Sequence, residues 1–524
     1  MKKSNSFLPT ALYTAEQVRS LDRCAIEDHQ LSASLLMKRA GKAAFDQMLS
    51  LWPQLNTVHV FCGSGNNGGD GYVLAALAAQ RNLSVTVWQL ATAEKLVGAA
   101  LGAYRYACQE KVMIQPFSLL AWQQQLPINS IDTENIIVDA LLGTGVIGSV
   151  RPEYAEAIAA INHRHCPVLA LDIPSAVEPD TGHVSDMAVE ADATISFIGL
   201  KLGAFTAKGR VCSGQIYFSD LGVPSSIYSS TQAVATRLIL DDVMDILPSR
   251  PIDARKADCG HLLIIGGDHG FGGAPLMSAE MALRCGVGMA TVATRSEHIS
   301  AILSCRPELM AVAVASIEKL QSLLKKPNTL VVGPGMGCSC WSIDLLSHVI
   351  DTELPMVIDA DALNLLASND LHLNTDQPRW ILTPHPGEAA RLLGISSSQV
   401  QADRIHAARE IQARYGGVVV LKGPGTVVLD LNGNISICDH GNPGMATAGM
   451  GDVLSGLLGA LIAQELDVND AVRLGVCLHA AAADTLAQKH GVRGLLATDL
   501  IAMVRVMING VGTSRQMISG FVGD

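Results

Sequence analysis

The stretch Gly449-Met450-Gly451-Asp452-Val453-Leu454 joins two glycines and an aspartate to a long apolar segment. The apolar residues predict a buried helix over residues 453–464, and the glycines leave backbone N–H groups bare at its start. Such groups stabilise negative charge on a transferring phosphoryl group. In the first helical turn the dipole favours the ionised form of Asp452, which makes it a candidate base for an attacking hydroxyl. The alternative is a plain helix start after a glycine turn.

Strand and helix patterns alternate throughout this half of the chain. We expect buried parallel strands at residues 261–265, 289–293, 329–332, 356–359, 380–382 and 418–422, and long helices at 274–285, 453–464 and 470–490. This alternation predicts an open, mainly parallel sheet covered by helices. Ligands of such folds bind at the carboxyl ends of the strands.

Three further motifs follow predicted strands of this half. They are Gly333-Pro334-Gly335-Met336-Gly337, Pro384-His385-Pro386-Gly387-Glu388 and Lys422-Gly423-Pro424-Gly425-Thr426. Lys422 and the glycines after it are candidates for holding the phosphates or adenosine of a nucleotide. His385 is either a site residue or a satisfied surface group. Asp359 and Asp361 either help to hold a metal or cap a helix, and the pattern does not separate the two.

The first half of the chain shows the same alternation. Strands are predicted at residues 58–62, 84–89, 136–139, 168–172 and 193–198, and helices at 15–27, 34–50, 72–81 and 153–164. A polar stretch at 223–232 predicts a linker. We therefore expect an α/β protein of two domains. A Rossmann-like three-layer sandwich occupies residues 1–225, and a second α/β domain occupies residues 236–524.

The first half carries a glycine motif and several polar side chains at predicted strand ends. Gly63, Gly65 and Gly68 form a GxGxxG pattern, which makes an anion site at a helix start. No acidic residue follows about 20 positions later to hold a ribose, which argues against an ordinary dinucleotide-binding dehydrogenase. Other strand ends supply further polar groups, namely Asn67, Asp139, Asp172 and Ser175. Their oxygens suit a hard cation, one carboxylate is suited to acid–base work, and the alternative is that each aspartate caps a helix or turn.

The composition excludes several classes of protein. Net charge is 37 − 49 = −12 without a basic block, which argues against nucleic-acid binding. No run of about 18 apolar residues predicts a membrane span, and no signal-type segment follows Met1. Twelve cysteines lack CxxC or zinc spacing and are expected to be reduced thiols. We expect a cytoplasmic homo-oligomer that binds small molecules.

Three segments of the first half together resemble the NAD(P)H-hydrate epimerase family, over about residues 12–222. They are Asn66-Asn67-Gly68-Gly69-Asp70-Gly71, Val138-Asp139-Ala140-Leu141-Leu142-Gly143-Thr144-Gly145 and Leu171-Asp172-Ile173-Pro174-Ser175. The resemblance implies substrate contacts from Asn66, Asn67, Gly68, Gly69, Asp70, Gly143, Thr144, Gly145, Val146, Ile147, Gly148, Ser149 and Asp172, with Asp172 as a catalytic candidate. It also implies a potassium site from Asn67, Asp139 and Ser175. Ala176 departs from the family's glycine, and a positive φ there would strain it.

The motifs of the second half resemble the ribokinase-like superfamily, and within it the ADP-dependent NAD(P)H-hydrate dehydratases, over about residues 240–510. The resemblance implies that Ala274, Gly335, Gly337, His385 and Asp452 contact the hydrated nucleotide. It implies that Lys422, Gly423, Pro424, Gly425, Thr426, Gly449 and Gly451 contact ADP. Met450 replaces the family's usual serine or threonine, but its backbone N–H is retained. We expect Met445 and Met450 to be packing residues.

Together the two resemblances imply repair of hydrated NADH and NADPH. The first domain would interconvert the R and S hydrates, and the second would dehydrate the S form while ADP becomes AMP and phosphate. Potassium and magnesium would be the cofactors. The alternative is a ribokinase-like small-molecule kinase fused to a nucleotide-sensing module. The sequence leaves open whether ADP or ATP is preferred and which carboxylate drives epimerisation.

Overall fold

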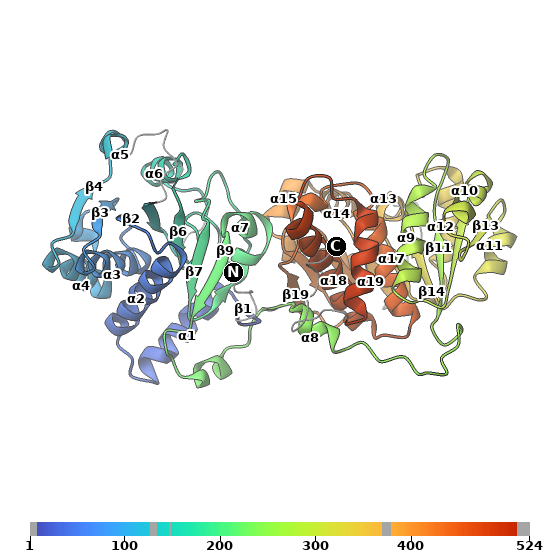
Figure 1. The fold of residues 1–524 in the computed structure, drawn as a ribbon, viewed down its shortest axis with the longest axis horizontal. Helices are drawn as coiled ribbons and strands as arrows, with labels where there is room; N and C mark the ends of the chain where they lie inside the picture. Colours follow the sequence, from blue (N-terminus) through green and yellow to red (C-terminus); the bar gives the residue numbers. More distant parts are fainter. Residues whose placement is uncertain (1–7, 126–133, 146–147, 165, 369–378, 511–524) are drawn as a thin grey trace, which may run out of the picture. The chain divides into compact units, whose positions relative to one another are not determined.

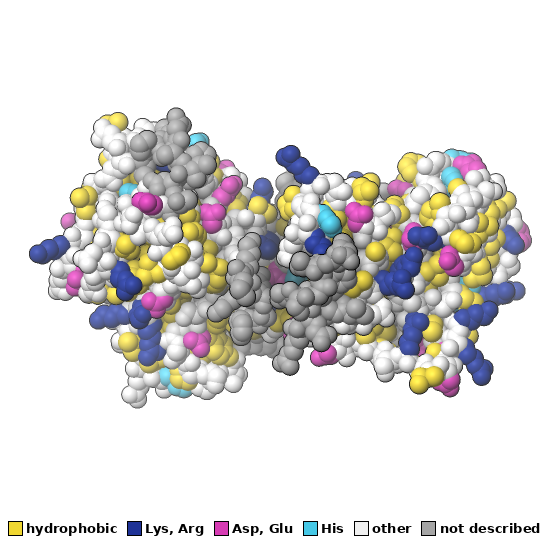
Figure 2. All heavy atoms as spheres, viewed as in Figure 1, with side chains coloured by type: hydrophobic (Ala, Val, Ile, Leu, Met, Phe, Trp, Pro, Cys, Tyr) yellow, Lys and Arg dark blue, Asp and Glu magenta, His cyan; other side chains and the backbone are white. Residues whose placement is uncertain are grey.

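The computed structural model describes residues 8–125, 134–145, 148–164, 166–368 and 379–510 (Figure 1). The chain forms two compact units, Met1–Thr236 and Arg237–Asp524. Each unit contains a mainly parallel sheet with helices, as the sequence predicts. Within the described ranges, no helix is long and apolar enough to cross a bilayer. On the face shown in Figure 2, Lys and Arg side chains are scattered among acidic and apolar ones rather than gathered in one block.

The sheet of the first unit has the strand order β4-β3-β2-β5-β6-β7-β9, and all its neighbours are parallel. The strands are β2 (Thr57–Cys62), β3 (Ser84–Gln89), β4 (Met113–Pro116), β5 (Asn135–Ala140), β6 (Val168–Leu171), β7 (Ala193–Phe197) and β9 (Gln215–Ser219). The five predicted strands are confirmed. The two edge strands β4 and β9 were not predicted, because their residues are mostly half-exposed and lack a continuous apolar run.

Helices cover both faces of this sheet. They are α1 (Ala15–Glu27), α2 (Ala33–Leu51), α3 (Asn66–Gln80), α4 (Gly98–Gln109), α5 (Leu119–Gln125), α6 (Pro152–Asn162) and α7 (Ala207–Cys212). Successive strand residues point to opposite faces. Val58 and Val60 therefore pack in a core with α1 to α4, while Phe61 packs in a second core with Trp122 of α5 and Tyr154 of α6. The predicted three-layer sandwich is confirmed.

The segment 223–232, predicted as a linker, packs on the first unit. It contains the short helix η4 (Ser225–Ser230), whose Ile227 is fully buried. The Tyr228 hydroxyl donates to the Ile198 carbonyl at 2.8 Å. After it, β10 (Ala235–Arg237) pairs with β1 (Ala11–Tyr13), which also pairs with β8 (Leu200–Lys201). The boundary between the units, after Thr236, therefore lies beyond the predicted linker.

The sheet of the second unit runs in the order β13-β12-β11-β14-β15-β16-β17-β18-β19. Its strands are β11 (His261–Ile265), β12 (Met289–Thr294), β13 (Met310–Ala313), β14 (Thr329–Val332), β15 (Met356–Ile358), β16 (Trp380–Leu382), β17 (Val418–Leu421), β18 (Thr426–Leu429) and β19 (Ile435–Cys438). All neighbours from β13 to β17 are parallel, and β18 and β19 add an antiparallel hairpin. The six predicted strands are confirmed.

Long helices pack against the apolar core of this second sheet. They are α9 (Gly273–Arg284), α17 (Met450–Ala463), α18 (Val468–His490) and α19 (Ala497–Ile508). The remaining helices are α8 (Leu240–Met244), α10 (Ile299–Cys305), α11 (Ile317–Leu323), α12 (Cys340–Val349), α13 (Ala360–Ala367), α14 (Pro386–Leu393), α15 (Ser397–Ala402) and α16 (Arg404–Tyr415). Every residue of α17 after Asp452 is buried, which confirms the predicted buried helix and fixes the position of its N-terminus.

Candidate active sites

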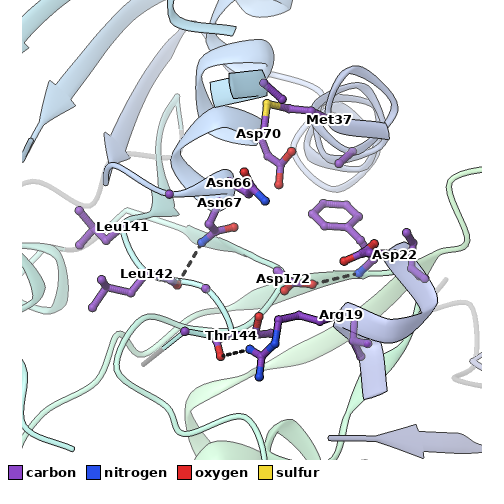
Figure 3. A pocket seen from close by; sticks show the side chains of 18 of the residues that line it. Arg19, Asp22, Met37, Asn66, Asn67, Asp70, Leu141, Leu142, Thr144 and Asp172 are labelled. Atoms are coloured by element: carbon purple, nitrogen blue, oxygen red, sulfur yellow. Dashed lines mark hydrogen bonds between the residues drawn. The ribbon is translucent and has the colours of Figure 1, made fainter. Parts of the chain in front are cut away.

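The first unit contains a cavity of about 620 Å³ at the carboxyl ends of β2, β5 and β6 (Figure 3). Helices α1 and α2 supply further lining residues. This is where open α/β sheets bind ligands. Of the residues that the sequence implicates, Asn66, Asn67, Asp70, Gly143, Thr144, Gly145, Ser149 and Asp172 line the cavity. Val146 and Ile147 lie outside the described residues.

The predicted glycine loop is shorter than expected, because Asn66 to Asp70 already form the first turns of α3. No side chain caps this helix at Gly65, so its first N–H groups are free for an anion. Gly68 packs against the backbone instead of lining the cavity, and a Cβ there would lie 2.2 Å from the Gly63 carbonyl oxygen. Gly69 packs against the Met37 side chain, and a Cβ there would lie 2.5 Å from Met37 Cε. These glycines allow close packing, and their predicted role as substrate contacts stays a prediction.

Asp139, Ser175 and Asn67 form a buried oxygen cluster at the ends of β5 and β6. The Ser175 hydroxyl donates to Asp139 Oδ1 at 2.6 Å, and the Ser175 N–H donates to Asp139 Oδ2 at 2.8 Å. Asn67 Nδ2 donates to the Leu142 carbonyl at 3.1 Å, while Asn67 Oδ1 is buried without a partner among the described residues. Burial raises the pKa of Asp139 to about 6, although its hydrogen bonds from Ser175 oppose the shift. Ser175 Oγ lies 3.2 Å from the same Leu142 carbonyl, so the three residues meet there. An unpaired buried oxygen at such a place is suited to a bound cation.

Asp172 lies just after β6 in a left-handed backbone conformation with φ 67°. Its Oδ1 accepts from the ammonium group of Lys201 and from the Phe197 N–H at 3.3 Å. The Lys201 side chain is fully buried. A strained backbone and a buried ion pair in one cavity are typical of a functional site.

The sequence analysis missed two of the charged residues in this cavity, Lys201 and Asp22. Lys201 interrupts an otherwise apolar stretch, and Asp22 follows the buried Leu21 and lies one turn after Val18. Each is a charged residue beside apolar residues that the fold buries. That mismatch is the signal that could have revealed them.

Ala176 has a φ of 74°, so it occupies the conformation that the family's glycine would adopt without strain. We expect Ala176→Gly to raise the free energy of unfolding of the first unit by about 0.5–1 kcal/mol, because relief of strain exceeds the added flexibility of the unfolded chain. Chemical unfolding measures this change. Ala188→Gly is the matched control, since Ala188 is also buried but has a negative φ, and it should lower stability. Equal losses in both variants would contradict the account.

In the second unit, Gly449 begins α17 with a φ of 90°. A Cβ at this position would lie 2.7 Å from Met277 Cε and 3.0 Å from Ala497 Cβ, so both conformation and space favour glycine. No side chain caps the helix, which leaves its first N–H groups free. Met450 is buried in the core and Met445 packs against that core, which confirms both as packing residues.

Lys422 and Asp359 form an ion pair beside this helix start, in which Asp359 is buried and Lys422 is partly buried. Lys422 Nζ lies 2.7 Å from Asp359 Oδ1 and 3.8 Å from Glu388 Oε2. The Ser455 hydroxyl of α17 donates to Asp359 Oδ2 at 2.5 Å. Asp359 makes no side-chain cap for α13, and its oxygens are occupied by Lys422 and Ser455. Asp359 is thus a counter-charge, and Asp361 accepts from the Gly337 N–H at 2.7 Å.

Asp452 differs from the expectation of an ionised carboxylate at a helix start. Burial raises its pKa to about 7, the nearby Asp359 charge adds to the shift, and Lys422 opposes it. The helix dipole, on which the expected ionisation of Asp452 was based, lowers the pKa, but burial raises it by more. A group that titrates near neutral pH is suited to accept and release a proton.

His385 caps α14, which agrees with the alternative that its hydrogen bonds are satisfied within the protein. Its Nδ1 accepts from the Gly387 N–H at 2.9 Å and from the Glu388 N–H at 3.2 Å. Burial lowers the pKa of His385, so the ring is neutral. Its Nε2 lies 3.4 Å from Glu388 Oε1, and half of the side chain is exposed. His385 therefore has a structural role and still presents an exposed edge.

Two further predicted residues of the second unit are glycines, Gly451 beside the Lys422–Asp359 pair and Gly335 beside α9. A Cβ on Gly451 would lie 3.3 Å from Asp359 Oδ2 and 3.4 Å from Lys422 Nζ, so its backbone faces the ion pair. Gly335 lies against Ala274 at the start of α9. The sequence analysis missed Arg404, a buried side chain that donates to the Leu421 and Lys422 carbonyls at 2.7 and 3.2 Å. Arg404 thereby holds the strand end that carries Lys422.

Known proteins resemble this chain along almost all its length. A protein of Coxiella burnetii called bifunctional NAD(P)H-hydrate repair enzyme is 45% identical over 500 residues, covering 95% of this chain and 100% of that protein. The chain belongs to this family. The corresponding protein of Escherichia coli is 41% identical, covering 97% of this chain and 96% of that protein. The predicted bifunctional repair enzyme, an isomerase joined to a lyase, is confirmed at the level of the family.

Family models and a solved structure match the units separately. The model described as NAD(P)H-hydrate dehydratase matches residues 262–505, and the model described as YjeF-related protein N-terminus matches residues 33–203. The ADP/ATP-dependent NAD(P)H-hydrate dehydratase of Bacillus subtilis, crystallised with ATP and Mg²⁺, is 27% identical. It covers 52% of this chain and 98% of its own chain, with a TM-score of 0.47.

Proposed function

We propose that the two described sites carry the two steps of repair. The cavity of the first unit interconverts the R and S hydrates of NADH and NADPH, and the start of α17 dehydrates the S hydrate with ADP as phosphoryl donor. The observation that carries this proposal is the uncapped N-terminus of α17 with Asp452 in its first turn. Lys422, which is held by Asp359, places an ammonium group next to it.

In the second unit, the ring hydroxyl of the S hydrate attacks the β-phosphorus of ADP while Asp452 takes the hydroxyl proton. The N–H groups of Gly449 and Gly451 face the developing negative charge. The lone pair of the ring nitrogen then expels phosphate, and loss of a ring proton restores the double bond of NAD(P)H. Lys422 to Thr426 and Gly449 hold the nucleotide, and Ala274, Gly335, Gly337 and His385 hold the hydrate.

Magnesium fits this site through the nucleotide rather than through a cage of protein ligands. Among the described residues, no group of three or more His, Cys, Asp or Glu side chains is placed to hold a metal ion. Magnesium commonly keeps several waters and binds through substrate phosphates. When bound with ADP it would neutralise phosphate charge, while Lys422 and the start of α17 orient the phosphates.

Potassium fits the oxygen cluster of the first unit, with Asn67, Asp139 and Ser175 as its ligands. The unpaired buried oxygen of Asn67 supports this assignment, because such an atom ordinarily has a partner. The fixed positive charge would hold the Leu142 segment, whose N–H donates to Ser175 Oγ at 2.9 Å. That segment leads into the predicted substrate contacts from Gly143 onward.

We expect Asn67→Ala to raise the potassium concentration for half-maximal epimerisation by about 10- to 100-fold, because one ligand is lost. Titration of potassium against choline at constant ionic strength measures this. Asn56→Ala is the matched control, since the Asn56 side chain is bonded to Glu134 outside the cluster. The potassium assignment would be contradicted if the rate of epimerisation did not depend on potassium concentration, or if both variants gave the same potassium titration.

The alternative of a small-molecule kinase makes a different product. Dehydration with ADP regains the absorbance of reduced nicotinamide and releases phosphate. A kinase leaves a stable phosphate ester without that absorbance. Recording the absorbance and the phosphorus spectrum of one reaction separates the two functions, and a lasting ester would overturn the proposed dehydration.

A further inference from the structure

Four ionisable side chains from four different elements line one part of the cavity in the first unit. Asp22 comes from α1, Asp70 from α3, Asp172 from the end of β6 and Lys201 from β8. Figure 3 shows the three carboxyl groups directed into the same space. These four groups, which we call the carboxyl cluster, are separate from the proposed potassium ligands.

Lys201 is a fixed cation within the carboxyl cluster. Its side chain is fully buried, and its ammonium group donates to Asp172, to Ser196 Oγ at 3.2 Å and to the Phe197 carbonyl at 3.0 Å. An ammonium group has three N–H donors, and all three are used. Lys201 is therefore not free to bind a substrate phosphate, and its charge serves Asp172.

Unlike Lys201, Asp22 and Asp70 lack hydrogen-bond partners for their side chains in the part of the chain that the structure describes. Burial raises the pKa of Asp22 to about 6, with Lys201 opposing and Asp172 adding to the shift. Burial also raises the pKa of Asp70 well above its ordinary value, and the charges of Asp172 and Asp22 add to this shift. The cluster thus combines one carboxyl group beside a fixed ammonium with two carboxyl groups whose protonated forms are favoured by burial.

The position of the cluster also indicates which part of the substrate lies beside it. The one ammonium group of the cluster is already bonded to Asp172, so the cluster has no free cation for the diphosphate of a dinucleotide. Arg19 and Arg151 line the same cavity with more exposed side chains, and Arg19 lies toward Thr144 in Figure 3. The arginines suit the phosphates, which leaves the uncharged hydrated ring for the carboxyl cluster.

We propose that Asp22 is the catalytic acid of epimerisation, that Asp172 is the catalytic base and that Lys201 is the positioning residue that holds the Asp172 carboxylate in place. Asp70 is the third carboxyl group of the cluster, and burial favours its uncharged form. This inference rests on the proposed epimerase function of the first unit. It assigns roles to Asp22 and Lys201, which no motif in the sequence identified.

The proposed step exchanges the ring hydroxyl with water. In the hydrate, the carbon that bears the hydroxyl is bonded to the ring nitrogen. Asp22 donates its proton to the hydroxyl, the carbon–oxygen bond breaks to release water, and the nitrogen lone pair forms a carbon–nitrogen double bond. A water molecule then adds to the opposite face as Asp172 takes one of its protons. Solvent returns a proton to Asp22 and removes one from Asp172, so atoms and charge balance.

The test compares Asp22→Asn, Lys201→Met and Lys201→Arg with matched exposed controls. Asp46→Asn and Lys42→Met serve as controls, because Asp46 and Lys42 form an exposed ion pair on α2 outside the cavity. Interconversion of purified epimers is followed by chromatography in H₂¹⁸O at several pH values, against buffer alone. Dehydratase activity of the second unit reports the amount of intact protein.

We expect Asp22→Asn to lower kcat for epimerisation by about 100-fold with KM little changed, as for loss of a general acid. In the wild type, the rate of epimerisation should fall as pH rises through the pKa of Asp22, because the acid loses its proton. The pH–rate profile of Asp22→Asn should lack this fall. The groups that face Asp22 are Lys201, Asp172 and Asp70, with Tyr228 of η4 and Arg19 on its own helix.

Lys201→Met should lower kcat for epimerisation, because Asp172 loses the ammonium group that holds it in place, and Lys201→Arg should restore part of that activity. Label from water should enter the ring hydroxyl at the rate of epimerisation. Asp22→Asn rates equal to those of Asp46→Asn, or epimerisation without label, would overturn the inference. If the wild type does not exceed buffer, the proposed epimerase function fails instead. Asp22→Asn is nearly isosteric, so it tests the acid even where Lys201→Met does not fold.

Discussion

Asp452→Asn is expected to lower ADP-driven dehydration of the S hydrate by about 1,000-fold, because an amide cannot accept the hydroxyl proton. Substrate and nucleotide binding should change little, since the backbone N–H groups at the start of α17 remain. Stopped-time chromatography of S hydrate and reduced nicotinamide measures the loss. Epimerisation should be unaffected, because its site lies in the other unit.

The pH dependence of the dehydration rate is a second test of Asp452 as the base. Burial raises the pKa of Asp452 to about 7. A base acts only in its ionised form, so the wild-type rate should rise as pH increases through about 7 and then level. Asp470→Asn is the matched control, because Asp470 also lies in the first turn of a helix but is only half-buried and lies outside this site. A control-like rate in Asp452→Asn, or a wild-type rate that is flat across this range, would contradict the assignment.

Lys422→Met is expected to lower the free energy of unfolding of the second unit by about 3–5 kcal/mol, because it leaves the Asp359 carboxylate buried without its counter-charge. Burial disfavours the charge on Asp359, while Lys422 and Ser455 hold its pKa below the ordinary value. Hydrogen exchange of the β15 and β17 amides measures the stability of the elements that carry the pair. Dehydration should fall as well, since Lys422 also orients phosphates.

The double variant Lys422→Met, Asp359→Asn separates the ion pair from simple packing. It removes both charges, so it should be more stable than Lys422→Met alone. Lys319→Met, at an exposed position of α11, should leave stability unchanged. A double variant that loses the sum of both single losses would show that the pair does not act as a unit.

Much of the fold follows from local sequence. Buried parallel strands are short apolar runs, so β2, β5 and β11 could be located from the sequence. Thr14 caps α1 with Gln17 in a capping box, which is likewise a local signal. Edge strands such as β4 and β9 carry mixed residues, because one side of an edge strand has no neighbour to bury it. Local pattern therefore does not distinguish them from loops.

The sites could be predicted only in part. Motifs at strand ends located Asp139 and Asp172, because the carboxyl ends of parallel strands share one edge. The glycines at the start of a buried helix located Asp452. The partners of these residues come from distant segments, as in the pair Lys422–Asp359 and in Lys201 beside Asp172. No local pattern indicates those pairings. The titration of Asp452 near neutral pH likewise depends on burial, which only the folded chain defines.

One chain that repairs both hydrates through two separate sites should consume both epimers. The most direct measurement is to incubate the purified chain with mixed R and S hydrates, ADP, magnesium and potassium, and to follow each epimer by chromatography. The account predicts that the S form disappears first, that the R form follows faster than it equilibrates in buffer, and that reduced nicotinamide appears in equal amount. Persistence of both epimers would contradict the account.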